Sequence, residues 1–266
     1  MRSPTRAWRS SGCLGLSLGL LAACFGCGAA PDDSTPIGSV AGSGGTASVP
    51  SVPPVNPLGR ARCQAPPGTT GSPGTIEEAI SLLNALPKPT SAACFVESLD
   101  RPLTAYATNS VFSAQPALSA RSPRIFLKLN RLWVSIVIDG ESSYLLEFSY
   151  LLPDALRSIK GEVETPVEQP LPPSAPYDRV LFGSGTNCGL CHYGEDQVPS
   201  ITFAKAFASI PFRPRPETRV NLVNLADGAR ICDWNLEPRR CDMLSALFDE
   251  GPIIEEAFPS EMPTFF

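Results

Sequence analysis

The chain is poor in several residue types on which common activities depend. Histidine occurs once in 266 residues, so a serine-hydrolase triad would have to use His192 as its base. The sequence contains no nucleophile elbow, phosphate-binding loop or zinc-protease motif. Lysine and arginine form no cluster, and the formal net charge is −5. These absences argue against the common hydrolases and against nucleic acid as a partner.

A long apolar run is also missing. Arg2, Arg6 and Arg9 precede a run of leucines and small residues at 14–23, which is too short to span a bilayer. A positive segment followed by a short apolar one is typical of a signal peptide. We therefore expect residues 1–23 to be a signal peptide, and the mature chain to be more acidic without its three arginines.

Residues 21–24 resemble the bacterial lipobox, in which the cysteine is lipidated and becomes the first mature residue. The resemblance implies that Cys24 attaches the protein to a membrane through lipid. Phe25 follows where an aspartate would favour the inner membrane, so the resemblance implies the outer one. Ordinary secretory cleavage nearby is the alternative. We expect a cell-envelope protein that faces the periplasm or the cell surface.

Composition divides the rest of the chain into four parts. Glycine, serine, proline and threonine dominate the start of residues 24–74, which predicts a flexible tether. Residues 75–165 carry regular apolar patterns and form the predicted β domain. Five prolines mark 166–177 as an extended connector. Residues 178–266 are predicted to form a smaller unit that packs on the β domain.

The patterns within 75–165 favour a mainly β fold. Thr75 and Glu78 read as a capping box that opens one amphipathic helix, which Pro87 ends. Alternating residues then predict strands at 94–99, 103–108, 125–129, 132–138 and 144–150. Both faces of the segment 132–138 are apolar, so we expect it to be buried on both sides. Short strands at close spacing predict an antiparallel sandwich-like domain with a few short helices.

The unit at 178–266 is expected to be small, irregular and mostly helical. Residues 178–185 read as a short strand entering a glycine loop. Apolar spacing predicts helices near 203–210 and 239–250. Between these elements lies the segment with the most specific chemistry.

That segment is 188–192, which reads Cys-x-x-Cys-His. Two thiols three positions apart suit thioether bonds to the two haem vinyl groups, and the adjacent imidazole suits the iron. Here the chain resembles the attachment motif of bacterial c-type cytochromes. The resemblance implies one haem c, bonded through Cys188 and Cys191, with His192 as the proximal iron ligand. The helix that usually precedes the motif in that family is absent from the predicted elements.

A second axial iron ligand must come from elsewhere, because no second histidine exists. Methionine is the usual alternative. Met262 lies in a proline-flanked loop and is the preferred candidate, ahead of Met243, whose amphipathic helix favours simple core contacts. An open distal side that binds a small ligand is a further alternative.

The remaining cysteines suggest an oxidising compartment. We predict disulfides Cys63–Cys94 and Cys232–Cys241. Without haem, the cysteines of 188, 191, 232 and 241 would pair among themselves. A zinc site made from the same cysteines and His192 is disfavoured, because Cys232 and Cys241 are too far apart for a second zinc knuckle.

Two functions follow from these residues. The first is an envelope lipoprotein with one covalent haem, which acts in electron transfer or in redox or ligand sensing with a partner protein. The second is a disulfide-stapled, non-catalytic lipoprotein whose β domain binds a partner or ligand. An enzyme is the less favoured interpretation, and a haem-based one is the easiest to defend.

Overall fold

The computed structural model describes residues 57–59, 62–153 and 156–265. The predicted signal peptide, the lipidation site at Cys24 and most of the tether lie outside these residues. Within them, no helix is both long and apolar enough to cross a membrane.

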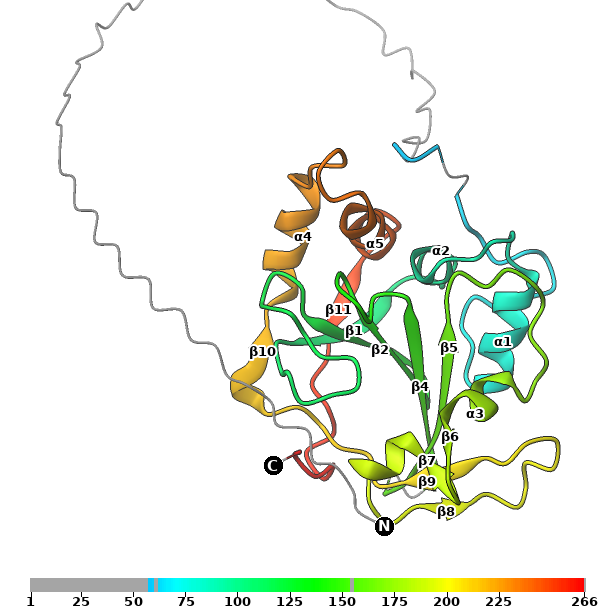
Figure 1. Ribbon diagram of the computed structural model, residues 1–266. Helices are drawn as coiled ribbons and strands as arrows, with labels where there is room; N and C mark the ends of the chain where they lie inside the picture. The colour runs from blue at the N-terminus through cyan, green and yellow to red at the C-terminus, as the bar shows by residue number, and fades with distance from the viewer. Residues whose placement is uncertain (1–56, 60–61, 154–155, 266) are drawn as a thin grey trace, which may run out of the picture. The chain divides into compact units, whose positions relative to one another are not determined.

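A nine-stranded sheet forms the centre of the fold (Figure 1). Five consecutive strands make an antiparallel meander: β1 (Leu103–Thr108), β2 (Arg124–Leu129), β3 (Leu132–Val137), β4 (Leu145–Leu151) and β5 (Ser158–Glu164). Beyond β5 lie β9 (Phe207–Ser209) and then β8 (Asp196–Gln197). At the other edge, β1 pairs with β10 (Arg219–Val220) and, in parallel, with β11 (Ile253–Glu255).

Turn residues set the register of the meander. The β2–β3 hairpin turns at Asn130, which has φ 58°, a left-handed conformation that asparagine tolerates. Gly140 follows β3 with φ 99°, and a Cβ there would lie 2.6 Å from Leu118. Both turns lie between strands that the sequence predicted.

One face of the sheet is covered by helices, and we call it the helix-covered face. Val134, Ile136 and Phe148 lie on it in one apolar core with residues of α1 (Ile76–Ala85), α2 (Ala92–Glu97) and α5 (Pro238–Phe248). Phe95 of α2 meets Phe148 edge to face at 6.4 Å. Apolar burial on this face supplies most of the driving force for folding.

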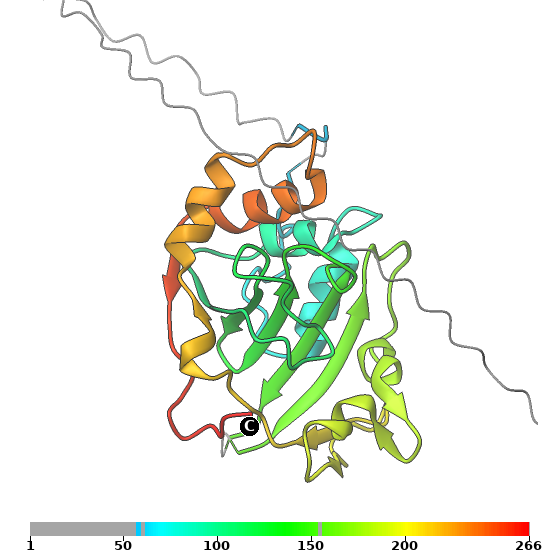
Figure 2. The ribbon, with the colours of Figure 1, turned by 60° about the vertical axis from the view of Figure 1, so that its left-hand side comes forward.

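The opposite face carries buried polar side chains, and we call it the polar face. The strand registers place Arg124, Ser135, Glu147, Ser149 and Lys160 there. The long connection from β1 to β2 runs across this face (Figure 2), and its Gln115 accepts a hydrogen bond from Ser135 at 2.8 Å. Trp133, Leu151 and Met262 form a smaller apolar cluster on the same side.

The mainly β composition with a few short helices is confirmed, but the arrangement differs from a sandwich. In the described residues, the meander and the strands β8 to β11 of the C-terminal part join one mixed sheet, while residues 181–182 and 185–186 form a separate two-stranded sheet. β8 to β11 all come from 178–266, so this part completes the sheet and is not a separate helical unit. A local sequence pattern does not reveal strand pairing of this kind, because the paired residues lie far apart in the sequence.

Several predicted elements are confirmed and four are corrected, among them the strand predicted at 178–185, whose first three residues are helical. Helix α1 begins at the Thr75 cap, whose hydroxyl accepts from the Glu78 amide at 3.2 Å. The strand predicted at 94–99 is instead helix α2, capped by Ser91. The helix predicted at 203–210 contains strand β9, and the connector 166–177 contains the start of α3 (Ala175–Val180). In α2 nearly every residue is buried, which hides the helical period.

Candidate functional site

The Cys-x-x-Cys-His segment follows a short hairpin. α3 leads into β6 (Leu181–Phe182), and Gly183 turns the chain with φ 61° into β7 (Gly185–Thr186). The 3₁₀ helix η1 (Asn187–Leu190) then carries Cys188, and the chain returns through β8 to the sheet. The structure thus places a short helix before the motif, although the β6–β7 hairpin separates the two.

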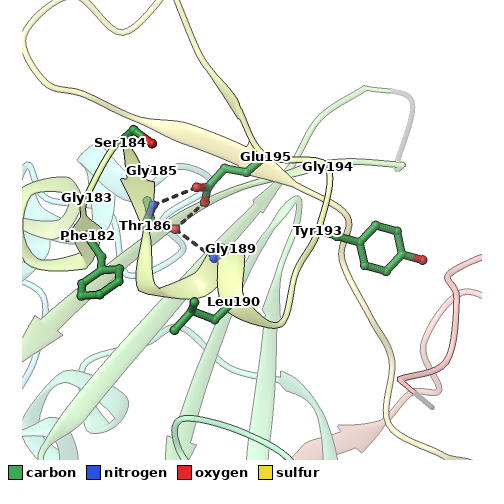
Figure 3. A pocket seen from close by; sticks show the side chains of 10 residues that line it. All are labelled: Phe182, Gly183, Ser184, Gly185, Thr186, Gly189, Leu190, Tyr193, Gly194 and Glu195. Carbon is green, nitrogen blue, oxygen red and sulfur yellow. Dashed lines mark hydrogen bonds between the residues drawn. The ribbon is translucent and has the colours of Figure 1, made fainter.

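A carboxylate holds the two ends of the motif loop together. The Thr186 backbone amide donates to Glu195 Oε2 at 2.8 Å, and the Thr186 hydroxyl donates to Glu195 Oε1. The same hydroxyl accepts from the Gly189 amide at 3.2 Å and so caps η1 (Figure 3). Thr186 is buried, which strengthens these bonds relative to water.

Glycine is needed where this carboxylate approaches the backbone. A Cβ on Gly185 would lie 2.1 Å from a Glu195 oxygen, and a Cβ on Gly189 would lie 2.8 Å from it. Either distance is shorter than any real contact, so a side chain at these positions would displace Glu195. The close approach of Glu195 therefore explains why glycine occupies position 189 of the motif.

The two motif cysteines are thiols, whereas the other four described cysteines form disulfides. Cys188 is half-buried and Cys191 is exposed. Burial raises the pKa of the Cys188 thiol to about 11, and the nearby charge of Lys160 only partly opposes this. Cys188 is therefore a protonated thiol at neutral pH.

His192 is oriented by a backbone carbonyl. Its Nδ1 lies 2.8 Å from the Ile210 oxygen. A carbonyl only accepts, so Nδ1 carries the proton and Nε2 keeps a free lone pair. Burial, with the charge of Lys160, lowers the pKa of His192 to about 3. A neutral imidazole fixed in this way matches the usual second-shell arrangement of a metal-ligating histidine.

Arg157 fastens the segment that follows the histidine. Its guanidinium donates to the carbonyl oxygens of Gly194 and Ala208 and to the Asp196 carboxylate, the last at 2.5 Å. These three bonds join the motif loop to β8 and β9. The planar fork of arginine suits several acceptors at once.

Both predicted disulfides are present. Cys63–Cys94 joins the segment before α1 to α2, and Cys232–Cys241 joins the loop after α4 (Leu222–Arg230) to α5. The second bond removes both thiols from the alternative zinc site. No group of three or more metal-ligating side chains occurs among residues 57–59, 62–153 and 156–265.

The two methionine candidates occupy apolar surroundings. Met243 lies in the main core with the other buried residues of α5. Figures 1 and 2 draw α5 and the β8–β9 region at opposite ends of the sheet. Met262 is buried against Trp133 and Leu151, and its carbonyl accepts from Arg213 at 2.8 Å. Phe212, next to Arg213, lies 5.4 Å from the His192 ring, so Met262 belongs to a segment near the motif.

A surface hollow of about 480 Å³ opens beside the motif (Figure 3). Phe182, Leu190, Tyr193 and Glu195 are among its lining residues. Phe182, Leu190 and Tyr193 are more than half exposed, which is unusual for large apolar side chains grouped along one loop. The two cysteines and His192 do not line this hollow.

No family model, no curated protein and no solved structure matches the chain. Function must therefore be argued from its own residues. Sequence reasoning found the motif but missed three groups that hold it: Glu195, Arg157 and the Ile210 carbonyl. Each acts through a contact between distant residues, which no local pattern encodes.

Proposed function

We propose that this protein is a cell-envelope lipoprotein that carries one covalent c-type haem and acts in electron transfer or in redox or ligand sensing. The observation that carries the proposal is the state of the motif. Cys188 and Cys191 are thiols, and His192 presents a neutral imidazole with its Nε2 lone pair free.

The residues fit the group that the motif implies. Thioether formation needs two reduced thiols, and iron ligation needs an unprotonated ring nitrogen. When bound, the haem supplies a one-electron centre, or a site for a small ligand if one axial position stays open. The chain's own residues orient the site: Ile210 fixes the imidazole, while Glu195 and Arg157 fix the loop on either side of it.

The exposed apolar side chains of the loop support a contact role. Phe182, Leu190 and Tyr193 would be covered by part of the cofactor or by a partner protein that exchanges electrons with it. Met262, or less favourably Met243, remains the predicted second axial ligand from the sequence.

The location rests on the N-terminal sequence. Lipidation at Cys24 would hold the protein at the outer membrane, facing the periplasm or the cell surface. We propose that it works as a carrier or sensor and not as an enzyme, with no role for nucleic acid.

The test is the intact mass of the protein after export from a host with cytochrome c maturation machinery. The wild type is expected to gain the mass of one haem, retained after denaturation. The C188S/C191S variant is expected to be exported without that gain. An unmodified wild type from a host that loads a control cytochrome would overturn the proposal.

A second candidate is a disulfide-stapled lipoprotein that binds a partner or ligand without redox chemistry. The two disulfides support it, since they fasten loops to helices α2 and α5 of the helix-covered face without reference to a cofactor. A colourless protein with Cys188 bonded to Cys191 would favour this function.

A further inference from the structure

The loop between α4 and α5, residues 231–237, carries two aliphatic side chains that lie in solvent. Ile231 is 85% exposed and Leu236 is 79% exposed, the two highest values among the large apolar side chains of the described residues. Trp234 lies between them in the sequence and is half-buried. Aliphatic side chains are unfavourable in water, and two of them grouped with a tryptophan in one loop indicate a contact surface.

Several contacts order this loop. The Cys232–Cys241 disulfide ties its start to α5. The Asp233 carboxylate accepts from the backbone amide of Asn235 at 2.9 Å. Glu237, at the end of the loop, accepts two hydrogen bonds from the guanidinium of Arg121, at 2.8 and 2.6 Å. A bidentate pair of this kind fixes orientation, so the loop presents its aliphatic side chains in a defined position.

The described chain begins at the same end of the fold. Arg62 forms an ion pair with Glu250, which lies just after α5. Figures 1 and 2 both draw the start of the described chain and the α4–α5 loop at one end of the fold, and the β6–β9 region at the other. An anchor that precedes residue 57 would therefore act on the end that carries the α4–α5 loop.

The proposed lipid anchor would keep this loop close to a bilayer. About 30 residues separate Cys24 from residue 57, and their composition predicts a chain that spans about 30 Å on average. Confinement within that distance raises the effective concentration of the loop at the membrane surface. A weak apolar contact then suffices for binding.

The charge of this region also suits a lipid surface. Residues 222–240 contain three acidic side chains and three arginines, whereas the whole chain has a formal net charge of −5. Because membrane surfaces are commonly anionic, this balanced segment is repelled less than the acidic parts of the chain. A tryptophan beside aliphatic side chains is typical of the membrane–water interface.

We propose that the α4–α5 loop inserts Ile231 and Leu236 into the surface of the bilayer that holds the Cys24 lipid, with Trp234 at the level of the headgroups. The inference rests on the proposed lipid anchor and adds an orientation to it. With this loop on the membrane, the Cys-x-x-Cys-His loop at the opposite end of the fold faces away from the lipid. Its exposed apolar side chains are then open to a partner protein.

The chain carries a natural probe for this contact. Two tryptophans remain after removal of the predicted signal peptide, and Trp133 is only 4% exposed, so Trp234 is the one that can meet lipid. The exported, lipidated protein is placed in vesicles of phosphatidylethanolamine and phosphatidylglycerol with either ordinary or brominated acyl chains. Bromine quenches tryptophan only at close contact, and any quenching by haem is common to both kinds of vesicle. The wild type is expected to lose emission in the brominated vesicles.

Three variants test the assignment. I231S/L236S is expected to stay with the vesicles through its acyl chains and to lose the quenching. W234F should lose it as well, which assigns the signal to the loop. V111S, at a valine that is 61% exposed in the connection from β1 to β2, is the control and should be quenched as the wild type is. Circular dichroism checks that each variant is folded.

Three results would overturn the inference. The first is a lipidated wild type with equal emission in both kinds of vesicle. The second is quenching that persists in I231S/L236S or in W234F. The third is an unquenched wild type that forms an oligomer in detergent which I231S/L236S dissociates, because the loop would then be an interface between copies of the chain.

Intact mass separates the inference from the function on which it rests. An exported protein without acyl chains refutes the anchor, and the docking with it. If acyl chains are present and Trp234 is not quenched, only the docking fails. A lipidated protein without haem refutes the redox function and leaves the docking to be decided by the same measurement.

Discussion

The two faces of the sheet differ in what they bury. The helix-covered face buries aliphatic and aromatic side chains from α1, α2 and α5. The polar face buries an ion pair, a serine–glutamine contact and a lysine without a carboxylate partner. Apolar burial explains the first face by stability alone. The second face is harder to explain in that way, because burying charge is unfavourable unless it is compensated.

The difference suggests that the helix-covered face maintains the fold and the polar face supports the motif. Natural chains tend to violate the rules of stable burial at functional sites. The predictions below test this division from the largest expected effect on stability to the smallest.

Truncating a core side chain on the helix-covered face should have the largest effect. Leu244 of α5 is fully buried, so L244A is expected to lower the free energy of unfolding by about 2–5 kcal/mol. Urea denaturation followed by circular dichroism measures this change. S135A on the polar face removes hydrogen bonds to Arg124 and Gln115 and should cost less, about 1–3 kcal/mol. An S135A loss larger than that of L244A would contradict the division.

The two disulfides should stabilise the fold unequally. Cys63–Cys94 closes 31 residues, and its removal in C63A/C94A is expected to cost about 3–4 kcal/mol. Cys232–Cys241 closes 9 residues, and C232A/C241A should cost about 2–3 kcal/mol. Both can be measured by urea denaturation under non-reducing conditions. A larger loss from the shorter loop would show that contacts, and not chain entropy, dominate here.

Replacing the buried lysine should stabilise the chain made without haem. Below pH 8 the folded and unfolded states are both protonated, and the folded state bears the cost of a buried ammonium. Between about 8 and 10.5 the folded state has released its proton and the unfolded state has not, so wild-type stability rises with pH. K160M is therefore expected to gain about 1–3 kcal/mol at pH 7, a gain that fades by pH 10.5.

The measurement is the free energy of unfolding of K160M and of the wild type across pH. In the difference between the two curves, the contributions of titrating groups common to both proteins cancel. K128M is the matched control, because Lys128 is already paired with Glu256. A destabilised K160M at neutral pH would mean that Lys160 supports the fold and would weaken the functional account of the polar face.

Loosening the motif loop should have the smallest effect on overall stability. E195Q places an amide where the Thr186 amide and hydroxyl both donate, and is expected to cost about 1–2 kcal/mol. The change should appear as faster hydrogen exchange at Thr186 and Gly189, with the sheet amides unaffected. E261Q, at an exposed carboxylate beside Ser260, is the control. Equal hydrogen-exchange protection of Thr186 and Gly189 in E195Q and the wild type would show that Glu195 does not hold the motif loop.

The meander was predictable because its signals are local. Strand β1 was placed at its observed bounds, and the hairpin turns at Asn130 and Gly140 depend on residues that tolerate positive φ. α1 followed from its cap and apolar spacing, and α5 from apolar spacing, in the same way. By contrast, α2 was predicted as a strand because its residues are buried on all sides and show no period.

The edges of the sheet and most of the site were not predictable. β8 to β11 are two or three residues long and form only because a neighbouring strand supplies their hydrogen bonds. The motif was found because five consecutive residues carry its chemistry. Its supports were missed because Arg157, Glu195 and Ile210 meet the motif through tertiary contacts. Strand β5, which carries Lys160, was not predicted at all.

The central claim is that Cys188, Cys191 and His192 hold a haem that takes up and releases an electron. Its most direct test is the reduced-minus-oxidised absorption spectrum of the purified, exported protein. The account predicts a sharp, reversible α band of a c-type haem that persists after removal of non-covalent pigments. A protein without visible absorption, from a host that loads a control cytochrome, would contradict the claim.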